Sequence, residues 1–306
     1  MLIAELATIS AAWLVLSLLF CGLGAVFRRL VRPSVLEPTD LFLDWWMGWA
    51  LCVAFLLAWH LFLPITPWAY LPLGIAGAAG ASMEWKSWQV ALRAMEREWG
   101  WLAVLILLAC VAIASQTLGP ERQYDTAYYH RQSVRWAQAY PAVPGLAYLN
   151  PHFAKNSSFF LFAALVDRVE ILGRSLRIAT GLLFLPPIVN GIVRAHEAII
   201  NRIRIDLSAW FQLLMLPVVL WQSRRYAAGL SPDGVVFVLA VVLSAELLRL
   251  LTRNGAGSEQ SKTPVSSDYR VFAIVVLAVI GVTVKLSFAF FAVGRLGSLF
   301  GVGRAP

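Results

Sequence analysis

Residues 2–26 read LIAELATISAAWLVLSLLFCGLGAV, and this apolar stretch decides the fold class of the chain. A helix needs about 20 apolar residues to cross the hydrocarbon core of a bilayer. No basic region precedes the stretch, which is longer than the core of a cleavable signal, so we expect a retained transmembrane helix. Arg28, Arg29 and Arg32 follow it directly. Because positive charge is retained on the cytoplasmic side, the N-terminus is expected outside.

The composition extends this conclusion to the whole chain. Of its 306 residues, 59% are hydrophobic and 14% are charged, and long apolar runs recur. This pattern predicts an all-α, polytopic transmembrane helical bundle, a single integral membrane domain over residues 1–306. An outer-membrane barrel is excluded because short alternating segments are missing. The net charge of +8 does not indicate nucleic acid, because Lys and Arg lie mostly in short links between apolar runs.

The apolar runs predict about eight crossings and one interfacial helix. The crossings are expected at residues 2–26, 41–63, 68–83, 101–114, 176–193, 207–221, 235–251 and 271–293. The run at 159–172 is too short to span and ends in charged residues, so we expect it to lie at the interface or to enter only partly. The resulting alternation puts basic links inside, as the positive-inside rule requires.

One long polar segment interrupts the apolar pattern. Residues 121–158 read ERQYDTAYYHRQSVRWAQAYPAVPGLAYLNPHFAKNSS. We expect the active site in this outer, periplasmic loop, taken as residues 118–158. If residues 123–139 form a helix on the membrane, helical spacing predicts a shared polar face. The members of that face are Asp125, Tyr128, Tyr129, Gln132 and Arg135; His130 lies within the same helix, and His152, Lys155 and Asn156 form a second polar group.

Asp125 allows two interpretations. A carboxylate within hydrogen-bond reach of an attacking hydroxyl can serve as a general base. Asp is also favoured at the N-cap of a helix, and the two roles do not exclude one another. With an imidazole, Asp125 could also hold a divalent ion, but His130 and His152 alone do not make a metal site.

Positive charge on the expected outer side indicates an anionic ligand. Arg122, Arg131, Arg135, Lys155, Arg224 and Arg225 all lie in two outer loops, where the charge rule disfavours them. Two adjacent arginines at a helix end can hold a phosphate bidentately, although snorkelling at the interface is the commoner role for such a pair. We place Lys285 within the last apolar run, where an ionisable group predicts function, although it could also snorkel.

Several phrases of the sequence resemble bacterial members of the GT-C superfamily of polytopic glycosyltransferases, which are similar to the protein mannosyltransferases and lipid A sugar transferases. They are Tyr-Asp-Thr-x-x-Tyr-His at 124–130, Val-Pro-Gly-Leu at 143–146, Asn-Ser-Ser-Phe-Phe at 156–160, Ser-Pro-Asp-Gly at 231–234 and Val-Lys-Leu-Ser at 284–287. The resemblance covers roughly residues 101–290.

The resemblance implies an inverting transferase in the bacterial inner membrane. It implies a polyprenyl-phosphate-linked sugar as donor, a glycan, lipid or protein as acceptor, and contact with membrane lipid. The family's acidic residue in the first large outer loop matches Asp125, as base or as ligand of a divalent ion. For the lipid phosphate we nominate Lys155, Arg224 and Arg225, with His152 as a further candidate.

The sequence departs from the family in two respects. Members often pair two acidic residues, and here only Glu121 lies near Asp125 in sequence. Members also continue through more spans, which predicts that this chain is a truncated product. The alternatives to a transferase are a transporter, a non-catalytic membrane scaffold or an inactive fragment of the enzyme. A transporter is disfavoured because its expected internal repeats and polar midspan helices are not visible in the sequence.

Overall fold

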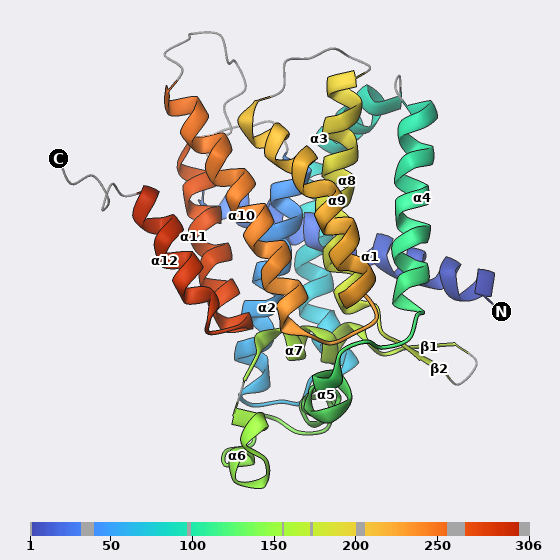
Figure 1. Ribbon diagram of the computed structural model, residues 1–306, viewed down its shortest axis with the longest axis vertical. Helices are drawn as coiled ribbons and strands as arrows, with labels where there is room; N and C mark the ends of the chain where they lie inside the picture. Colours follow the sequence, from blue (N-terminus) through green and yellow to red (C-terminus); the bar gives the residue numbers. More distant parts are fainter. Residues whose placement is uncertain are drawn as a thin grey trace.

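The computed structural model describes residues 2–31, 40–96, 99–154, 156–171, 174–199, 206–255 and 267–299, which form a helical bundle with one short hairpin (Figure 1). The long helices are α1 (Leu2–Val31), α2 (Leu41–His60), α3 (Tyr70–Glu96), α4 (Trp99–Thr117), α8 (Ala179–Ile199), α9 (Leu207–Tyr226), α10 (Pro232–Gly255) and α11 (Ser267–Val284). The short elements are η1 (Pro67–Ala69), η2 (Thr126–His130), α5 (Arg131–Ala139), α6 (Leu146–Leu149), η3 (Pro151–Ala154), α7 (Ser158–Val166) and α12 (Phe288–Leu299). Strand β1 (Val169–Ile171) pairs antiparallel with β2 (Arg174–Leu176).

The bundle is that of a helical membrane protein. Within the ranges given above, four helices are long and apolar enough to cross a bilayer: α1, α2, residues 100–117 of α4 and residues 232–252 of α10. A further apolar segment, Tyr269–Val284, is shorter. The composition therefore predicts the class correctly. The expected number of eight crossings is not established by these criteria, because the other long helices are shorter or less apolar.

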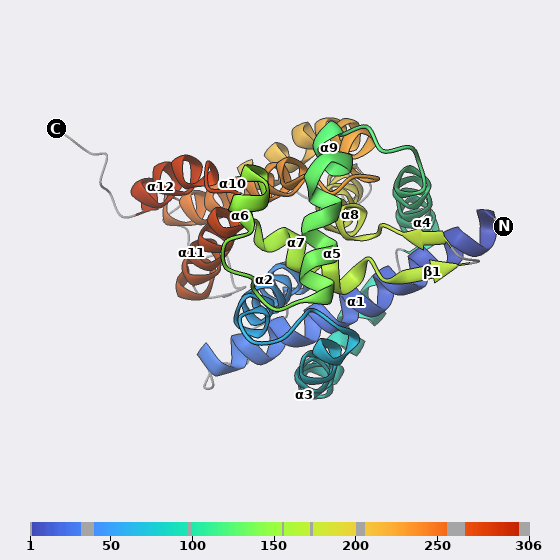
Figure 2. The same cartoon turned by 90° about the horizontal axis from the view of Figure 1, so that it is seen from below.

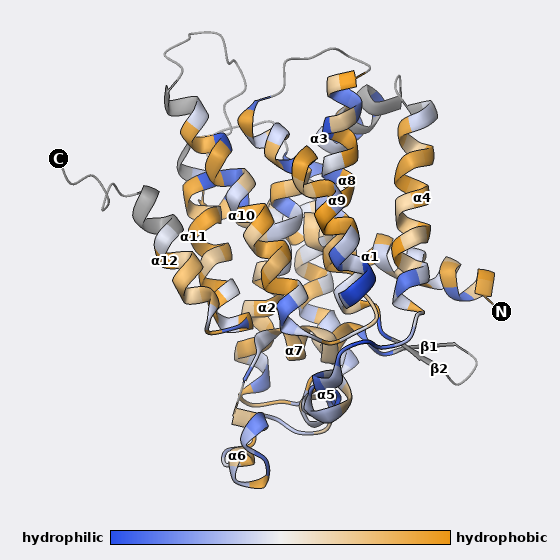
Figure 3. Cartoon of the chain, viewed as in Figure 1, coloured by the Kyte–Doolittle hydropathy of each residue, from blue (hydrophilic) through white to orange (hydrophobic). Residues whose placement is uncertain are grey.

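The bundle has two distinct ends. One, which we call the loop end, carries residues 118–154 and 156–157, the β1–β2 hairpin and the turn at 227–231, and α5 lies across it (Figure 2). The other, the opposite end, carries the C-terminus of α8, the N-terminus of α9 and the C-terminus of α10. Hydrophobic residues dominate the flanks of the helices, whereas hydrophilic residues collect on α5 and its surrounding segments (Figure 3).

Glycines bring α1, α2 and α3 into close contact. A Cβ on Gly48 would lie 1.8 Å from the carbonyl oxygen of Phe20, and one on Gly80 would lie 1.9 Å from that of Gly22. Small residues allow helix backbones to approach closely in a membrane, where van der Waals packing drives association. The ring of Phe20 also meets Trp45 edge-on, with centroids 5.2 Å apart. These three helices form a closely packed layer, in which α1 is oblique to α2 and α3 (Figure 2).

Buried ion pairs join the helices at the opposite end. Arg28 on α1 donates to both carboxylate oxygens of Asp44 on α2, each at 3.1 Å, and lies 3.4 Å from Glu84 on α3. Arg270 on α11 pairs with Asp40 at 2.7 Å. A buried charge needs such a partner, because desolvation otherwise makes it very costly. Arg28, which the sequence presents as a topology signal, is therefore also structural.

Helix α7 is buried within the bundle and does not cross it. Every residue of α7 is buried, and Nε2 of Gln138 on α5 donates to the carbonyl of Ala164 at 3.0 Å. Asp167 ends the helix and accepts from the backbone N–H groups of Ile178 and Ala179 at the start of α8. The expectation of a non-spanning segment fits this structure, but a surface position at the interface is wrong. An apolar helix without a polar face is buried by its neighbours.

The last apolar run, 271–293, is two helices rather than one span. Helix α11 ends at Val284 and α12 folds back beside it (Figure 1). The turn is possible because a glycine faces the ring of Phe288: a Cβ on Gly281 would lie 2.3 Å from that ring. Lys285 therefore lies in a turn at the loop end, with 42% of its side chain exposed, and its expected position within a span is wrong.

Candidate functional site

The first half of the polar loop forms a helix with a π-helical turn. Thr126–His130 has π-helical hydrogen bonding and continues directly into α5. The extra residue in a π turn shifts the helical register, and such turns are frequent at functional sites. The buried positions are Thr126, Tyr129, His130, Val134 and Ala137. The expected shared polar face is therefore only partly correct, because Tyr129 is buried while Asp125, Tyr128, Gln132 and Arg135 are exposed.

Asp125 does not act as a helix cap. Its backbone is already helical, with φ −59° and ψ −28°, and its side chain makes no capping hydrogen bond. The carboxylate is exposed, and it has no hydrogen bond or ion pair to any residue that the structure describes. An acid that stabilises no local structure has its oxygens open to solvent. It therefore remains available for proton transfer or ligand contact.

Tyr129 connects Asp125 to a second carboxylate. The pKa of Tyr129 is raised by burial and by the negative charges of Asp125 and Asp233. Asp233 belongs to the Ser-Pro-Asp-Gly phrase, far from Asp125 in sequence. The structure thus supplies a second acidic group beside Tyr129, which sequence proximity alone does not reveal.

Local geometry explains why Asp233 lies there. Ser231 precedes the first turn of α10, and its Oγ accepts from the backbone N–H of Asp233 at 3.3 Å. Thr126 Oγ1 accepts from the N–H of Leu230 at 3.2 Å, which fixes this turn against the π-helical segment. Gly234 is required because a Cβ there would lie 2.8 Å from the Cβ of Tyr226. The Ser-Pro-Asp-Gly phrase is therefore a capped helix start that presents Asp233 to the loop.

Glu121, the expected neighbour of Asp125, has a different role. Its Oε2 accepts from Arg131 at 2.9 Å and from Arg177 at 2.5 Å. These ion pairs tie the start of the loop to α5 and to the segment that precedes α8. Glu121 is therefore a structural anchor, and Asp233 is the acid that acts with Asp125 on Tyr129.

The two loop histidines lie in different environments. His152 is half-buried, and its ring centroid lies 5.1 Å from that of Tyr128 and 5.0 Å from that of Tyr129. Its backbone N–H donates to Oδ1 of Asn150 at 2.9 Å, which fixes the turn. His130 is buried, with Nδ1 3.4 Å from the Thr126 hydroxyl. The structure therefore places His152 beside Tyr129 at the surface and His130 in the interior.

Three arginines surround an open pocket of about 430 Å³ at the rim of the bundle. It is lined by Arg122, Trp221, Arg224 and Arg225. None of the three guanidinium groups has an acidic partner within the described portion of the sequence. Trp221 is 67% exposed at the end of α9, so the pocket borders an apolar surface. Arginines without carboxylates can bind an oxyanion through charge-assisted, bidentate hydrogen bonds.

The structure does not place the other expected site residues at Tyr129 or in the arginine pocket. Arg135 is exposed on α5. Asn156 lines a separate cavity beneath α5. Lys155 lies outside the described residues. Arg122 was not nominated as a ligand from the sequence, although its position among the outer basic residues was the available signal.

The described side chains do not assemble a metal site. Among the residues with assigned positions, no group of three or more His, Cys, Asp or Glu side chains is close enough to hold an ion. Asp125 and Asp233 both influence Tyr129, and one or two carboxylates together with substrate phosphates and water are the usual ligands of Mg²⁺.

The chain matches a protein-family model. A family model described as Domain of unknown function (DUF8201) matches residues 6–301. No curated protein and no solved structure matches the chain. The match covers nearly all of the sequence, including the loop and the arginine pocket.

Proposed function

The chain belongs to the family Domain of unknown function (DUF8201), and we propose that it is an inverting glycosyltransferase of GT-C type. It would move a sugar from a polyprenyl-phosphate donor to a glycan, lipid or protein acceptor. The loop end would face the periplasm of the bacterial inner membrane. The eight long helices, α1 to α4 and α8 to α11, would be the crossings, because α12 at about 18 Å is too short to span.

The observation that carries the proposal is the state of Asp125. It is an exposed carboxylate with no cap, hydrogen bond or ion pair in the described structure. It lies three residues from Arg122, which lines the arginine pocket at the same end of the bundle. A free base and a cationic pocket at the same end of the bundle are the groups that sugar transfer from a phosphate requires.

The arginine pocket suits the phosphate of a lipid-linked donor. Its three cations would hold the phosphate, and the exposed ring of Trp221 borders the region where a polyprenyl chain would remain in the lipid. Tryptophan is favoured at this depth because its ring is apolar and its N–H is polar. A soluble sugar nucleotide would not need a pocket at the rim of the helices.

The reaction follows from these positions. Asp125 accepts the proton of the acceptor hydroxyl, and the hydroxyl oxygen forms a bond to the anomeric carbon. The bond from that carbon to the phosphate oxygen breaks, and its electron pair leaves with the polyprenyl phosphate. Attack opposite to the leaving group inverts the configuration. The arginines stabilise the negative charge that develops on the departing phosphate.

The test is transfer of labelled sugar in proteoliposomes from a panel of polyprenyl-phosphate sugars. We compare the wild type with Asp125→Asn and with Glu197→Gln, a matched neutralisation on α8 near the opposite end. Glu197 pairs with Arg194 at 2.8 Å, far along the chain from the loop. The proposal expects transfer by the wild type and the control but at least about 100-fold less by Asp125→Asn.

The other outcomes decide between the alternatives. Transfer that survives Asp125→Asn would remove Asp125 as the base. If none of the three proteins transfers sugar from any donor, the enzyme proposal fails and the scaffold or transporter alternative is favoured.

A further inference from the structure

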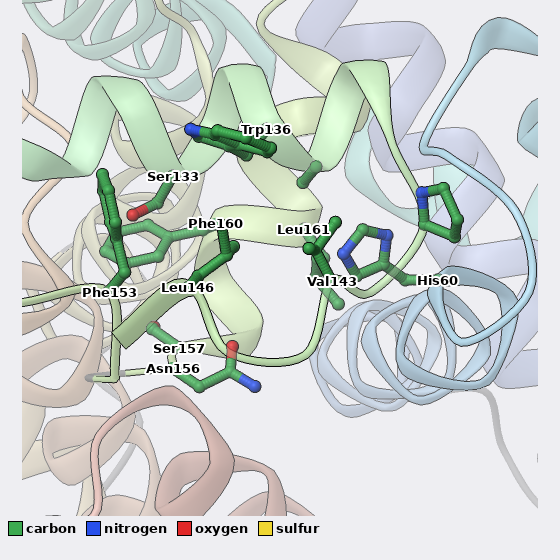
Figure 4. A pocket seen from close by; sticks show the side chains of 12 residues that line it. His60, Ser133, Trp136, Val143, Leu146, Phe153, Asn156, Ser157, Phe160 and Leu161 are labelled. Atoms are coloured by element: carbon green, nitrogen blue, oxygen red, sulfur yellow. The ribbon is translucent and has the colours of Figure 1, made fainter. Parts of the chain in front are cut away.

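A second cavity lies beneath α5, apart from the arginine pocket. It has a volume of about 80 Å³ and is formed where α2, α5, α7 and residues 141–154 and 156–157 meet (Figure 4). One water needs about 10–15 Å³ of such space, so the cavity can hold a small ring or part of one. Its lining comprises His60, Ser133, Trp136, Ala137, Pro141, Val143, Leu146, Phe153, Asn156, Ser157, Phe160 and Leu161.

Backbone hydrogen bonds hold the walls in place. The N–H of Ile65 donates to the carbonyl of Ala137 at 2.8 Å, and the N–H of Ala142 donates to the carbonyl of His60 at 2.8 Å. These bonds fix the end of α2 against α5 and the following turn. The cavity is therefore largely preformed, which lowers the entropic cost of binding a ligand.

The walls combine aromatic surface with polar groups. Trp136, Phe153 and Phe160 provide rings, and Figure 4 shows these three on the side of the cavity away from His60. Asn156 contributes an amide. The described lining contains no Lys, Arg, Asp or Glu, so nothing there recognises a charged ligand. Ligand sites commonly pair apolar walls with a few polar groups in this way.

His60 carries an unmet hydrogen-bonding requirement. Its Nδ1 is buried and has no hydrogen-bond partner in the described structure. A buried polar atom without a partner is costly and requires an explanation. A neutral imidazole presents one nitrogen as an acceptor, which a ligand hydroxyl can satisfy. A purely apolar occupant, such as a lipid chain, would leave this nitrogen unpaired.

The cavity adjoins the candidate active site. Phe153 of its lining follows His152, whose ring contacts Tyr129. Ser133, also in the lining, donates from Oγ to the carbonyl of Tyr129 at 3.0 Å. The cavity is thus connected to Tyr129 through the turn at His152 and through helix α5.

We propose that this cavity binds one neutral hydroxylated ring, a sugar residue of the acceptor. The apolar face of the ring packs against Trp136, and a hydroxyl donates to Nδ1 of His60. Asn156 bonds a further hydroxyl. The assignment to the acceptor rests on the proposed transferase function, whereas sugar binding itself does not.

Binding to the full-length protein in detergent tests the proposal, by saturation-transfer NMR with a panel of neutral hexoses, an N-acetylhexosamine and a uronic acid. At least one neutral sugar is expected to bind and the uronic acid is not. Trp136→Ala should abolish the signal. Trp210→Ala is the matched control, because Trp210 is 54% exposed on α9 and does not line the cavity.

A second variant separates ligand recognition from folding. His60→Leu should weaken sugar binding roughly tenfold, the effect of one hydrogen bond. Its thermal unfolding should remain cooperative, which separates a loss of sugar binding from a loss of fold. No neutral-sugar signal from the wild type, or an unchanged signal from Trp136→Ala, would overturn the proposal.

The result is distinguishable from the outcome of the transfer assay. Asp125→Asn should bind the neutral sugar as the wild type does, because Asp125 does not line the cavity. Sugar binding without transfer would therefore support the cavity and contradict the transferase. Transfer without sugar binding would support the transferase and contradict the cavity.

Discussion

Lys285 and Asp233 form an ion pair that ties the turn after α11 to the first turn of α10. The pair brings together the phrases Val-Lys-Leu-Ser and Ser-Pro-Asp-Gly, which are separated by about 50 residues of chain. The negative charge of Asp233, like that of Asp125, raises the pKa of Tyr129. The turn between α11 and α12 is thus connected to the loop that carries the proposed base.

We predict that Lys285→Met lowers transfer while leaving the fold intact. Both side chains are more than 40% exposed, and a pair of this kind contributes about 1 kcal/mol or less to stability. The substitution leaves Asp233 without its partner, and the unpaired negative charge would repel a phosphorylated donor. We expect kcat/KM for the donor to fall roughly tenfold, a change of about 1.4 kcal/mol. Steady-state kinetics and a thermal melt measure the two effects.

Lys285→Arg is the conservative variant and should keep most of the activity. Lys86→Met, at an exposed position on α3, is the matched control. Equal kcat/KM values for Lys285→Met and the wild type would show that the pair has no part in the site.

The arginine pocket gives a prediction about donor affinity. Alanine at Arg122, Arg224 or Arg225 should each raise KM for the lipid-linked donor roughly tenfold, because each removes a hydrogen bond to a charged group. The affinity that remains should depend less on salt, since fewer exposed charges contribute. Arg93→Ala, an exposed change on α3, is the control.

Donor titrations at two salt concentrations make this measurement. If all three variants keep the wild-type KM, the arginines only anchor the protein at the membrane surface. An effect confined to kcat would instead assign them to stabilisation of the leaving phosphate in the transition state.

Much of the helical framework can be read from the sequence, because about 20 consecutive apolar residues have few other structures available. The boundary errors have local causes. The run at 271–293 is apolar throughout, and only the packing of Phe288 against Gly281 shows that it turns at Lys285. The run at 159–172 has the composition of an interfacial or a buried helix, and its neighbours decide between them.

The candidate site was less accessible from sequence. Asp125 is exposed as expected, but its partner across Tyr129 comes from α10, a contact that no local pattern encodes. A π-helical turn shifts Tyr129 into the interior, which regular helical spacing does not predict. The arginine pocket likewise combines a loop residue, Arg122, with the end of α9.

Gly48, in the contact between α1 and α2, and Gly74, at an open position on α3, predict opposite effects on stability. Gly48→Ala should destabilise the protein, because its Cβ would lie 1.8 Å from the carbonyl oxygen of Phe20 and one helix must shift. Overpacking of this kind costs about 1–3 kcal/mol. Gly74→Ala on α3 meets no atom within 4 Å and should be neutral or stabilising by up to about 1 kcal/mol. Unfolding in detergent measures both; a Gly48→Ala protein as stable as the wild type would contradict the close contact.

Asp167 makes stability depend on pH. Burial raises the pKa of this carboxyl to about 7, although the N–H groups of Ala179 and Ile178 oppose the shift. The protonated form is therefore favoured in the folded state. Its contribution to stability is full below the unfolded pKa near 3.8 and is lost as the pH rises through about 7.

Asp167→Asn should remove this dependence, because its amide is neutral at every pH while its oxygen still accepts from the α8 N-terminus. One unit of pKa shift corresponds to about 1.4 kcal/mol, so the variant should gain at least about 1 kcal/mol on the wild type between pH 5 and pH 8. Thermal unfolding across this range is the measurement. Asp206→Asn is the control, since Asp206 caps α9 from an exposed position through the N–H of Ala209 at 2.7 Å. Parallel pH profiles for Asp167→Asn and the wild type would mean that Asp167 remains ionised in the folded protein.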